Sequence, residues 1–419
     1  MALWLDWQIV KQIVSRRMIV ALFMGFASGL PLFLTTGSLI QAWMTEEGVD
    51  LSVIGLTALI GLPYAVKFLW APIFDRYIPP FLGRRRGWLI LIQILLMGAI
   101  VLLGRTEPAQ NLYMVALAAF LVTFLSASQD IVADAYRRED LPDEELGLGS
   151  SMFINGYRVG ILLATGGGLI MADHMAYRSV YLIMAACMGV GVLTTLFTPE
   201  PDLPDDTPRT LREAVVDPLI DYFKRSNALL ILTFILLYKV GDTMASTMTM
   251  PFYLDMGFTK TEVGAVVKLF GFWATILGSV IGGILMLRIG ILKSLWIFGV
   301  LQALSTAGFC LIAIIGHHVP LLSAVIAFEN LSAGMGTSAY AAYMASLTNK
   351  KFTATQYALL SSLMGIPRVF AAAPTGYFAT IFGWKSFFIL CTVSALPGLL
   401  LLFRIAPWWN RSNPVALVE

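Results

Sequence analysis

Two carboxylates four residues apart lie within an apolar stretch of this chain. Asp130 and Asp134 close a run that begins near Asn111, and a helix places residues i and i+4 on one face. If Arg137 marks the water boundary, Asp130 lies roughly 10 Å deep at about 1.5 Å per residue. A carboxylate at that depth is costly unless it is protonated, paired or facing a water-filled cavity. Asp130 is therefore a candidate for proton or substrate binding.

The two carboxylates have different candidate partners. Asp134 lies near the predicted cytoplasmic boundary, so it is either a gate partner for Arg76 or a second proton-coupling group. Arg158 lies about 16 Å into a helix that starts near Gly147, and Asp130 on the preceding helix is its expected partner. A substrate anion that competes for Arg158 would free Asp130 to take a proton.

The second half of the chain carries its own ionisable residues at membrane depth. Lys239 and Asp242 are at i and i+3, so they either neutralise each other or bind substrate. Glu329 has no basic neighbour in the local sequence. We expect it either to bind a proton or to pair across helices with Lys268 or Arg368.

The candidate substrate-binding set combines these cations with nearby polar groups. It comprises Lys67, Gln129, Tyr157, Arg158, Lys239, Asp242, Lys268 and Arg368. Within the apolar segments, five cations stand against four carboxylates. This balance favours a large, polar, net-anionic substrate.

The elements that position these residues must span a membrane. Hydrophobic residues make up 58% of the 419 residues, charged residues 13%, and the mean hydropathy is +0.78; soluble domains carry about twice that charge. A net charge of only +2 argues against a nucleic-acid partner. Single cysteines within apolar runs and the lack of a phosphate-binding loop indicate no metal, redox or nucleotide cofactor. An ion gradient is then the expected driving force.

Twelve apolar runs have the length of a transmembrane helix. They fall at about 18–40, 51–73, 88–104, 111–136, 148–171, 178–197, 228–250, 261–287, 292–315, 320–345, 356–380 and 385–405. The expected organisation is an amphipathic segment (1–17), a six-helix half (18–197), a cytoplasmic linker (198–227), a second six-helix half (228–405) and a cytoplasmic tail (406–419).

Basic residues predict the orientation. With both termini in the cytoplasm, inner segments hold 19 Lys and Arg residues and outer loops hold four. Inner loops of membrane proteins carry this excess. We therefore expect both ends inside.

The halves repeat each other. Residues 48–55 (Gly-Val-Asp-Leu-Ser-Val-Ile-Gly) resemble residues 257–264 (Gly-Phe-Thr-Lys-Thr-Glu-Val-Gly), and Arg158 recurs as Arg368. Offsets of 209 and 210 are close to half the chain. A six-helix unit duplicated in parallel is typical of the major facilitator superfamily, with a central site between two halves.

A polar corner after the second predicted helix resembles the signature loop of that superfamily. An Asp-Arg pair is followed by a glycine and a basic cluster, while the second half has Leu287 in place of the aspartate. We interpret the corner as a cytoplasmic latch that engages neighbouring helix ends; the alternative is that the arginines only set topology. The candidate gating residues are Asp75, Arg76, Arg84, Arg85, Arg86 and Arg288.

The N-terminal half resembles the bacterial muropeptide permeases of the AmpG type. The resemblance rests on residues 29–31, 41–44, 61–64, 67–72, 75–77, 83–88, 128–136 and 156–158, and less sharply on 365–368 and 374–376. It implies proton-coupled import of N-acetylglucosaminyl-anhydro-N-acetylmuramyl peptides across the bacterial inner membrane, for peptidoglycan recycling and, in some bacteria, β-lactamase induction. It also implies that Asp130 belongs to the coupling machinery and that the chain is a monomer.

Other functions remain open at this point. The Gln-Asp-Ile pattern at 129–131 also resembles acetyl-CoA transporters, so acetyl-CoA, a small peptide or a siderophore fragment are alternative solutes. A non-transporting membrane sensor would need an output domain larger than 198–227. A membrane enzyme would need clustered catalytic residues, whereas His174, His317 and His318 all fall at outer helix ends.

Overall fold

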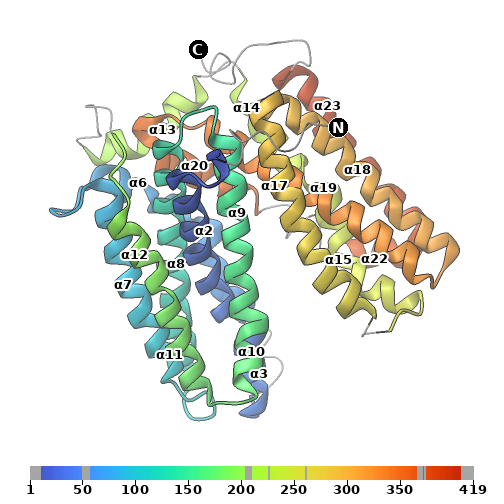
Figure 1. The fold of residues 1–419 in the computed structure, drawn as a ribbon, viewed down its shortest axis with the longest axis horizontal. Helices are drawn as coiled ribbons and strands as arrows, with labels where there is room; N and C mark the ends of the chain where they lie inside the picture. The colour runs from blue at the N-terminus through green and yellow to red at the C-terminus, as the bar shows by residue number, and fades with distance from the viewer. Residues whose placement is uncertain are drawn as a thin grey trace. The chain divides into compact units, whose positions relative to one another are not determined.

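A computed structural model describes residues 11–49, 57–202, 210–224, 227–259, 262–365, 371 and 374–406. Every regular element in these ranges is a helix (Figure 1). This is the expected outcome for an apolar chain, because a helix satisfies its own backbone hydrogen bonds within the bilayer.

The described residues contain ten helical segments that are long and apolar enough to cross a bilayer. They are Arg16–Glu46, Arg84–Gly104, Leu112–Asp140, Leu146–Ala172, Tyr177–Phe197, Ala228–Asp255, Val263–Ile289, Ile291–Ile315, Val319–Ser346 and Thr375–Ile405. The last of these turns sharply at Gly383, where φ is 71°. Positive φ is readily available only to glycine.

The remaining two expected spans, 51–73 and 356–380, are described in part, and the second ends in the helical residues that precede the turn at Gly383. The described part of the first, from Thr57 on, consists of short pieces: η1 (Thr57–Gly61), α5 (Leu62–Val66), η2 (Lys67–Leu69) and α6 (Ala71–Arg76). Proline within a helix removes a hydrogen bond and clashes with the preceding turn, and here Pro63 and Pro72 each begin a new piece. The second begins with α20 (Thr353–Leu363), and both spans include residues outside the described ranges.

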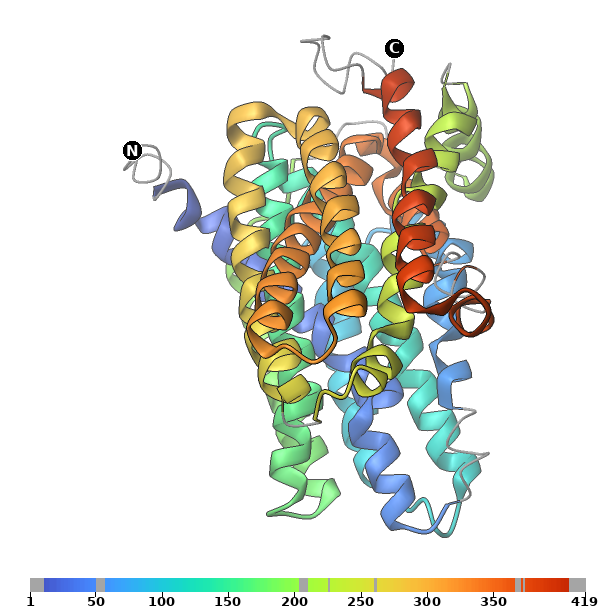
Figure 2. The ribbon, with the colours of Figure 1, turned by 90° about the vertical axis from the view of Figure 1, so that its right-hand side faces the viewer.

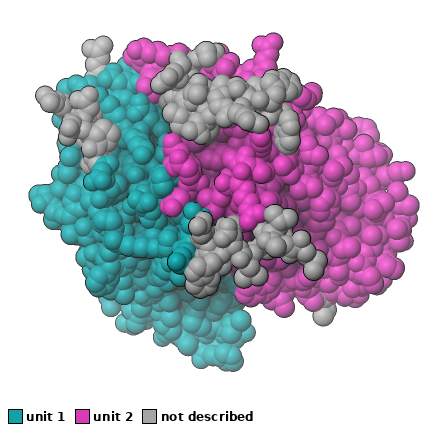
Figure 3. All heavy atoms as spheres, turned by 45° about the horizontal axis from the view of Figure 1, so that its top comes forward, with its two compact units in different colours: residues 1–142, 152–219, 348–362 teal, residues 143–151, 220–347, 363–419 magenta. Residues whose placement is uncertain are grey.

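The chain forms two compact units (Figure 3). Unit 1 comprises residues 1–142, 152–219 and 348–362, and unit 2 comprises 143–151, 220–347 and 363–419. The division falls within the predicted linker. However, 143–151 belongs to unit 2 and 348–362 to unit 1, so the units are not the two continuous halves expected from the sequence. The linker also contains a helix that the sequence reading omitted, α13 (Leu211–Phe223).

Unit 1 is built around α8 (Leu112–Asp140). The α8 helix packs against α7 (Arg84–Gly104) and α2 (Arg16–Thr36), and α7 also contacts α11 (Tyr177–Cys187) and α12 (Gly189–Phe197). The α2 helix continues as α3 (Ser38–Glu46). Glycines let α2 approach α9 (Leu146–Leu162) closely, because a Cβ at Gly29 would lie 2.0 Å from the Tyr157 carbonyl oxygen. Small residues serve this purpose in membrane helices, and here they position the polar residues of α9. A π-helical turn, η3 (Leu163–Gly167), and α10 (Gly168–Ala172) complete that span.

In unit 2, α19 (Val319–Ser346) packs against α17 (Gly271–Ile289) and α18 (Ile291–Ile315), and the three run side by side (Figures 1 and 2). The α15 helix (Val240–Asp255) packs on α22 (Thr375–Ser394), and α14 (Ala228–Leu237) packs on α23 (Leu396–Ile405). The π-helix η4 (Val263–Phe270) precedes α17, and the short 3₁₀-helix η5 (Lys350–Phe352) precedes α20.

Candidate functional site

The α8 helix buries both central carboxylates. Asn111 caps its first turn by accepting a hydrogen bond from Met114 N at 3.1 Å, and the helix runs unbroken through the acidic face. Asp130 and Asp134 are 7% and 8% exposed. Among the described residues, Oδ1 of Asp130 is buried without a hydrogen-bond partner. This atom is therefore available to a proton or a ligand.

Lys67 is the basic neighbour of this pair. It acts electrostatically on both Asp130 and Asp134, and Ser28 and Tyr64 also interact with Asp130. The lysine is buried at 4% exposure, and Nζ lies 5.8 Å from the centroid of the Tyr64 ring. The broken second span carries this lysine to α8. Arg158, the partner expected from the sequence, is half-buried on α9, and its pairing with Asp130 stays a prediction.

Further contacts fix this broken segment to α8. The Tyr64 hydroxyl lies 2.7 Å from Ser126 Oγ. Trp70 Nε1 donates to Ser128 Oγ at 3.0 Å, and its ring packs on Phe124 at 4.8 Å. The segment between the two prolines is therefore bonded to α8 at Ser126 and Ser128.

Two other predicted residues lie beside the Asp130 cluster. Gln129 is buried, and its Oε1 lacks a hydrogen-bond partner within the described part of the chain. Tyr157 is half-buried on α9 and acts electrostatically on Tyr64. Unit 1 therefore brings together Lys67, Asp130, Asp134 and Tyr157, and Gln129 is buried on α8 directly before Asp130.

Unit 2 contains a second polar cluster, centred on Lys239. This residue lies where α14 and α15 meet, with non-helical angles of φ −106° and ψ 4°. Its Nζ is 3.4 Å from Asp242 Oδ2, and it donates to Gln302 Oε1 at 3.1 Å and Thr337 Oγ1 at 3.3 Å. Lys239 and Asp242 therefore form an ion pair, and substrate binding by the two residues stays a prediction.

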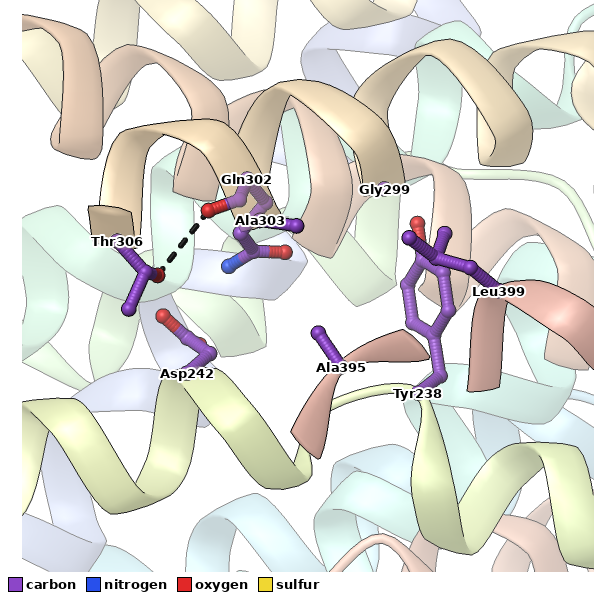
Figure 4. Close-up of a pocket in the computed structure, with 8 residues that line it drawn as sticks. All are labelled: Tyr238, Asp242, Gly299, Gln302, Ala303, Thr306, Ala395 and Leu399. Atoms are coloured by element: carbon purple, nitrogen blue, oxygen red, sulfur yellow. Dashed lines mark hydrogen bonds between the residues drawn. The ribbon is translucent and has the colours of Figure 1, made fainter. Parts of the chain in front are cut away.

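A small pocket opens beside this cluster (Figure 4). It is lined by Tyr238, Asp242, Gly299, Gln302, Ala303, Thr306, Ala395 and Leu399. The side chains of Asp242, Gln302 and Thr306 form its polar side, and Tyr238, Ala395 and Leu399 its apolar side. Gln302 Nε2 is buried without a partner among the described residues, so this donor can serve a water molecule or a ligand.

Glu329 also belongs to this second cluster. Ser305 Oγ donates to its Oε2 at 2.5 Å, and the carboxyl interacts with both Asp242 and Lys239. The expected basic partners were Lys268 and Arg368. Lys268 is exposed on η4, so the prediction of a Lys268 partner is wrong, and Arg368 lies outside the described residues.

The predicted latch is a buried network. Arg85 Nη2 contacts Asp75 Oδ1 at 2.7 Å and Glu139 Oε1 at 2.7 Å, while its Nε reaches Glu139 Oε2 at 2.9 Å. Arg84 Nη2 also contacts Glu139, at 2.9 Å. All four side chains are almost fully buried. Arg84 and Arg85 therefore do more than set topology, since they neutralise two buried carboxylates.

Asp75 also caps a distant helix. Its carboxylate accepts hydrogen bonds from Ala354 N at 3.3 Å, Thr355 N at 2.8 Å and Thr355 Oγ1 at 2.7 Å. These groups open α20, and a helix N-terminus favours an anion. The expectation that Asp75 engages a neighbouring helix end agrees with this geometry.

The other predicted gating residues lie outside this contact. Arg76 packs over the Tyr77 ring at 5.0 Å and is half-buried. Arg86 donates to the carbonyls of Thr195 and Leu196 at 3.0 and 2.8 Å. Arg288 is exposed in the last turn of α17.

Asp134 does not pair with Arg76, contrary to one sequence interpretation. Its Oδ1 accepts from Arg137 Nη2 at 2.9 Å. The same nitrogen donates to the Tyr357 hydroxyl at 2.9 Å. An i,i+3 pair is local to one helix, which explains why Arg137 takes this carboxylate.

Sequence reasoning missed Glu139, Glu200 and Tyr357. Glu200 accepts from the backbone N–H groups of Arg85 and Arg86 at 2.7 and 3.0 Å, which caps α7. One signal was present, because buried arginines require counter-charges. Residues separated by more than 50 positions gave no local cue to which carboxylate would serve.

Comparisons with known proteins agree with this architecture. The model of the Major Facilitator Superfamily matches residues 21–372 and 240–415. The "Anhydromuropeptide permease" of Escherichia coli (strain K12) is 47% identical over 388 residues, covering 92% of this chain and 79% of that protein. A protein of Haemophilus influenzae, described as "Uncharacterized protein", is 40% identical and covers 97% of this chain and 99% of its own length.

Solved structures show the same fold at low identity. The human organic anion transporter MFSD10 aligns with a TM-score of 0.67 and 17% identity, over 92% of this chain and 99% of that chain. The proton:xylose symporter XylE aligns with a TM-score of 0.68 and 11% identity, over 94% and 95%.

Proposed function

The chain belongs to the major facilitator superfamily, among the AmpG-type anhydromuropeptide permeases, and from this premise we propose that it imports anhydromuropeptides by proton symport. It is a multi-pass membrane transporter and not an enzyme. The proposed cargo is N-acetylglucosaminyl-anhydro-N-acetylmuramic acid and its peptides, carried from periplasm to cytoplasm for peptidoglycan recycling.

One observation carries the choice of substrate. Identity of 47% to the E. coli permease extends over 92% of this chain, so it includes the segments that hold both polar clusters. A sugar-peptide with several carboxylates also suits sites that combine buried cations with hydrogen-bonding groups.

In the proposed mechanism, the first coupling group is Asp130. Its carboxyl is buried beside Lys67, and one of its oxygens lacks a hydrogen-bond partner among the described residues. A buried acid that can be neutral or paired is suited to carrying a proton across a membrane. Asp134 and Glu329 are the further proton-coupling candidates.

Substrate carboxylates and amides are proposed to bind the polar groups of the two clusters together with Arg158 on α9, Lys268 on η4 and Arg368. These are Lys67, Gln129, Tyr157, Arg158, Lys239, Asp242, Lys268 and Arg368. Asp75, Arg76, Arg84, Arg85, Arg86 and Arg288 are proposed to gate the cytoplasmic side. The protein is proposed to work as a monomer in the inner membrane, with both termini in the cytoplasm.

Proteoliposomes test the proposal directly. A proton gradient, acid outside, is expected to concentrate labelled anhydromuropeptide in the vesicles, and an uncoupler should abolish the accumulation. Unlabelled muropeptide should compete, whereas acetyl-CoA and a simple dipeptide should not. Uptake competed by acetyl-CoA would overturn the substrate, and uncoupler-resistant accumulation would overturn proton coupling.

Asp130→Asn is the sharpest variant. An amide cannot take up the proton, so concentrative uptake should be lost while exchange of muropeptide across the membrane continues. An Asp130→Asn protein that still concentrates substrate on a proton gradient would exclude Asp130 as a coupling group.

A further inference from the structure

Three successive residues hold the first turn of α20 to three different elements of unit 1. Each contact uses a side chain that points away from α20, to α6, α13 and α8 in turn. The bonds are Thr355 Oγ1 to Asp75 Oδ2 at 2.7 Å, Gln356 Nε2 to the Pro218 carbonyl at 3.1 Å, and Arg137 Nη2 to the Tyr357 hydroxyl at 2.9 Å. The third contact is unlike the others because a charged donor makes it.

That donor is shared with a carboxylate. Nη2 of Arg137 donates to Asp134 Oδ1 at 2.9 Å and to the Tyr357 hydroxyl at the same distance. A terminal guanidinium nitrogen carries two hydrogens, so both bonds can form at once. The guanidinium also packs over the Phe153 ring at 4.6 Å. A single placement of the Arg137 side chain therefore serves both Tyr357 and Asp134.

Burial makes the arrangement sensitive to charge. Arg137 is 3% exposed, and its Nε has no hydrogen-bond partner among the described residues. A buried guanidinium that loses its carboxylate is left uncompensated, which is strongly unfavourable. Without Asp134 as an anion, Arg137 gains by turning toward water.

The charged and titratable groups around this contact come from three elements, α8, α20 and η2. Arg137 faces Tyr357, Asp134 and Asp130, and Asp134 faces Arg137 and Lys67. Asp134 is one helical turn from Asp130, and Lys67 acts on both carboxylates. A change in the charge of either carboxylate therefore changes the electrostatic interaction with Arg137.

We propose that Arg137 and Tyr357 make the docking of α20 depend on the charge of Asp134. Arg137 is the positioning residue, and the Tyr357 hydroxyl is the group that it holds. While Asp134 is anionic, Arg137 stays in place and α20 has three side-chain contacts. When Asp134 takes up a proton, the ion pair is lost and Arg137 releases Tyr357, while the bonds of α20 to Asp75 and Pro218 remain.

This inference rests on the proposed proton coupling for its role in transport. Transporters of this kind move one helix bundle against the other, and α20 lies in the second half of the sequence while its first turn belongs to unit 1. If protonation of Asp134 weakens the docking of α20, uptake of the proton is linked to the movement of the helix bundles.

Hydrogen–deuterium exchange of the full-length protein in lipid nanodiscs tests the coupling without transport. Tyr357→Phe keeps the ring and removes the hydroxyl, and Asp134→Asn keeps the shape and removes the charge. Each should raise the exchange rate of α20 amides by about fivefold to tenfold, the effect of losing one hydrogen bond. Because both act through Arg137, the double variant should exchange no faster than the faster single variant.

Tyr181→Phe is the matched control. Tyr181 is also fully buried in unit 1, and its hydroxyl makes one hydrogen bond, to the Leu34 carbonyl at 2.9 Å. Its loss should leave exchange of α20 unchanged. If Asp134→Asn does not fold, Arg137→Gln combined with Tyr357→Phe completes an equivalent cycle.

Two results would overturn the inference: unchanged α20 exchange in Tyr357→Phe, or effects of Tyr357→Phe and Asp134→Asn that simply multiply. Failure of the proposed function is seen separately. A wild-type protein that does not accumulate muropeptide would reject the function, while the exchange cycle would still decide whether Asp134 controls α20.

Discussion

The Asp75 carboxylate and the backbone N–H of Thr355 meet at 2.8 Å, although 280 positions separate them in the chain. The same carboxylate contacts Arg85 at 2.7 Å. One buried anion thus neutralises a buried arginine and caps α20, and Glu139 supplies the second negative charge.

Asp75→Asn should destabilise the folded protein by about 3 kcal/mol, because it leaves a buried arginine with half of its compensation. The asparagine carbonyl can still accept a hydrogen bond from Thr355 N. Its NH₂ group would then face Arg85, which is also a donor, so that bond would be lost. Thermal unfolding of the purified protein measures the loss. Asp173→Asn, at an exposed loop position, is the control, and equal unfolding temperatures for the two variants would show that the network contributes little.

Lys67→Met should also lower stability by about 3 kcal/mol, since it removes the lysine that acts on the buried Asp130, while Asp134 keeps its ion pair with Arg137. Adding Asp130→Asn restores charge balance, so the double variant should recover folded yield but not transport. Lys350→Met, at an exposed site, controls for loss of a lysine. Additive losses in the double variant would contradict a direct interaction of Lys67 with Asp130.

Glu329→Gln should separate exchange from accumulation. The amide oxygen can still accept from Ser305, which lies 2.5 Å from the native carboxylate, but the side chain can no longer bind a proton. Muropeptide exchange between equal compartments is expected to continue, and proton-driven concentration should fall to background. Glu107→Gln, at an exposed position, should behave like the wild type. Full accumulation by Glu329→Gln would remove this residue from the coupling set.

The contacts of the Glu262 carboxylate at the start of η4 should make the stability of the protein depend on pH in the acid range. The backbone N–H of Thr259, the side chain of His317 and the Thr259 hydroxyl lower the pKa of Glu262; Thr259 N donates to its Oε2 at 2.8 Å, and His317 lies 3.1 Å away. A pKa lowered by folding stabilises the native state above the ordinary pKa of about 4.5, and this stabilisation is lost as the pH falls through the lower, folded value.

The fall in unfolding temperature below about pH 4.5 should therefore be smaller in Glu262→Gln than in the wild type. The effect will be modest because the carboxylate is exposed to solvent. Unfolding temperatures recorded from pH 7 to pH 3.5 provide the comparison. Identical pH profiles would mean that the cap contributes nothing to stability.

Several features could be predicted from the sequence because they depend on local physics. Apolar runs of spanning length identify membrane helices, and an Asp at i and another at i+4 share a face of α8 whatever the rest of the chain does. The i,i+3 relation of Lys239 and Asp242 likewise brought them within pairing distance. The residue types of the Asp75 corner likewise predicted contact with a neighbouring helix end, which the bond from Thr355 N provides.

Only the tertiary structure decided which charges meet. Lys67 acts on Asp130, because the second span, which is broken near Pro63 and Pro72, brings the lysine to α8. Glu139 neutralises Arg84 and Arg85 from more than 50 residues away, and Tyr357 reaches Arg137 from 220. Sequence spacing carries no information on such pairs, since long-range packing sets their distances. The residue types specified that buried charges needed partners; the fold alone chose them.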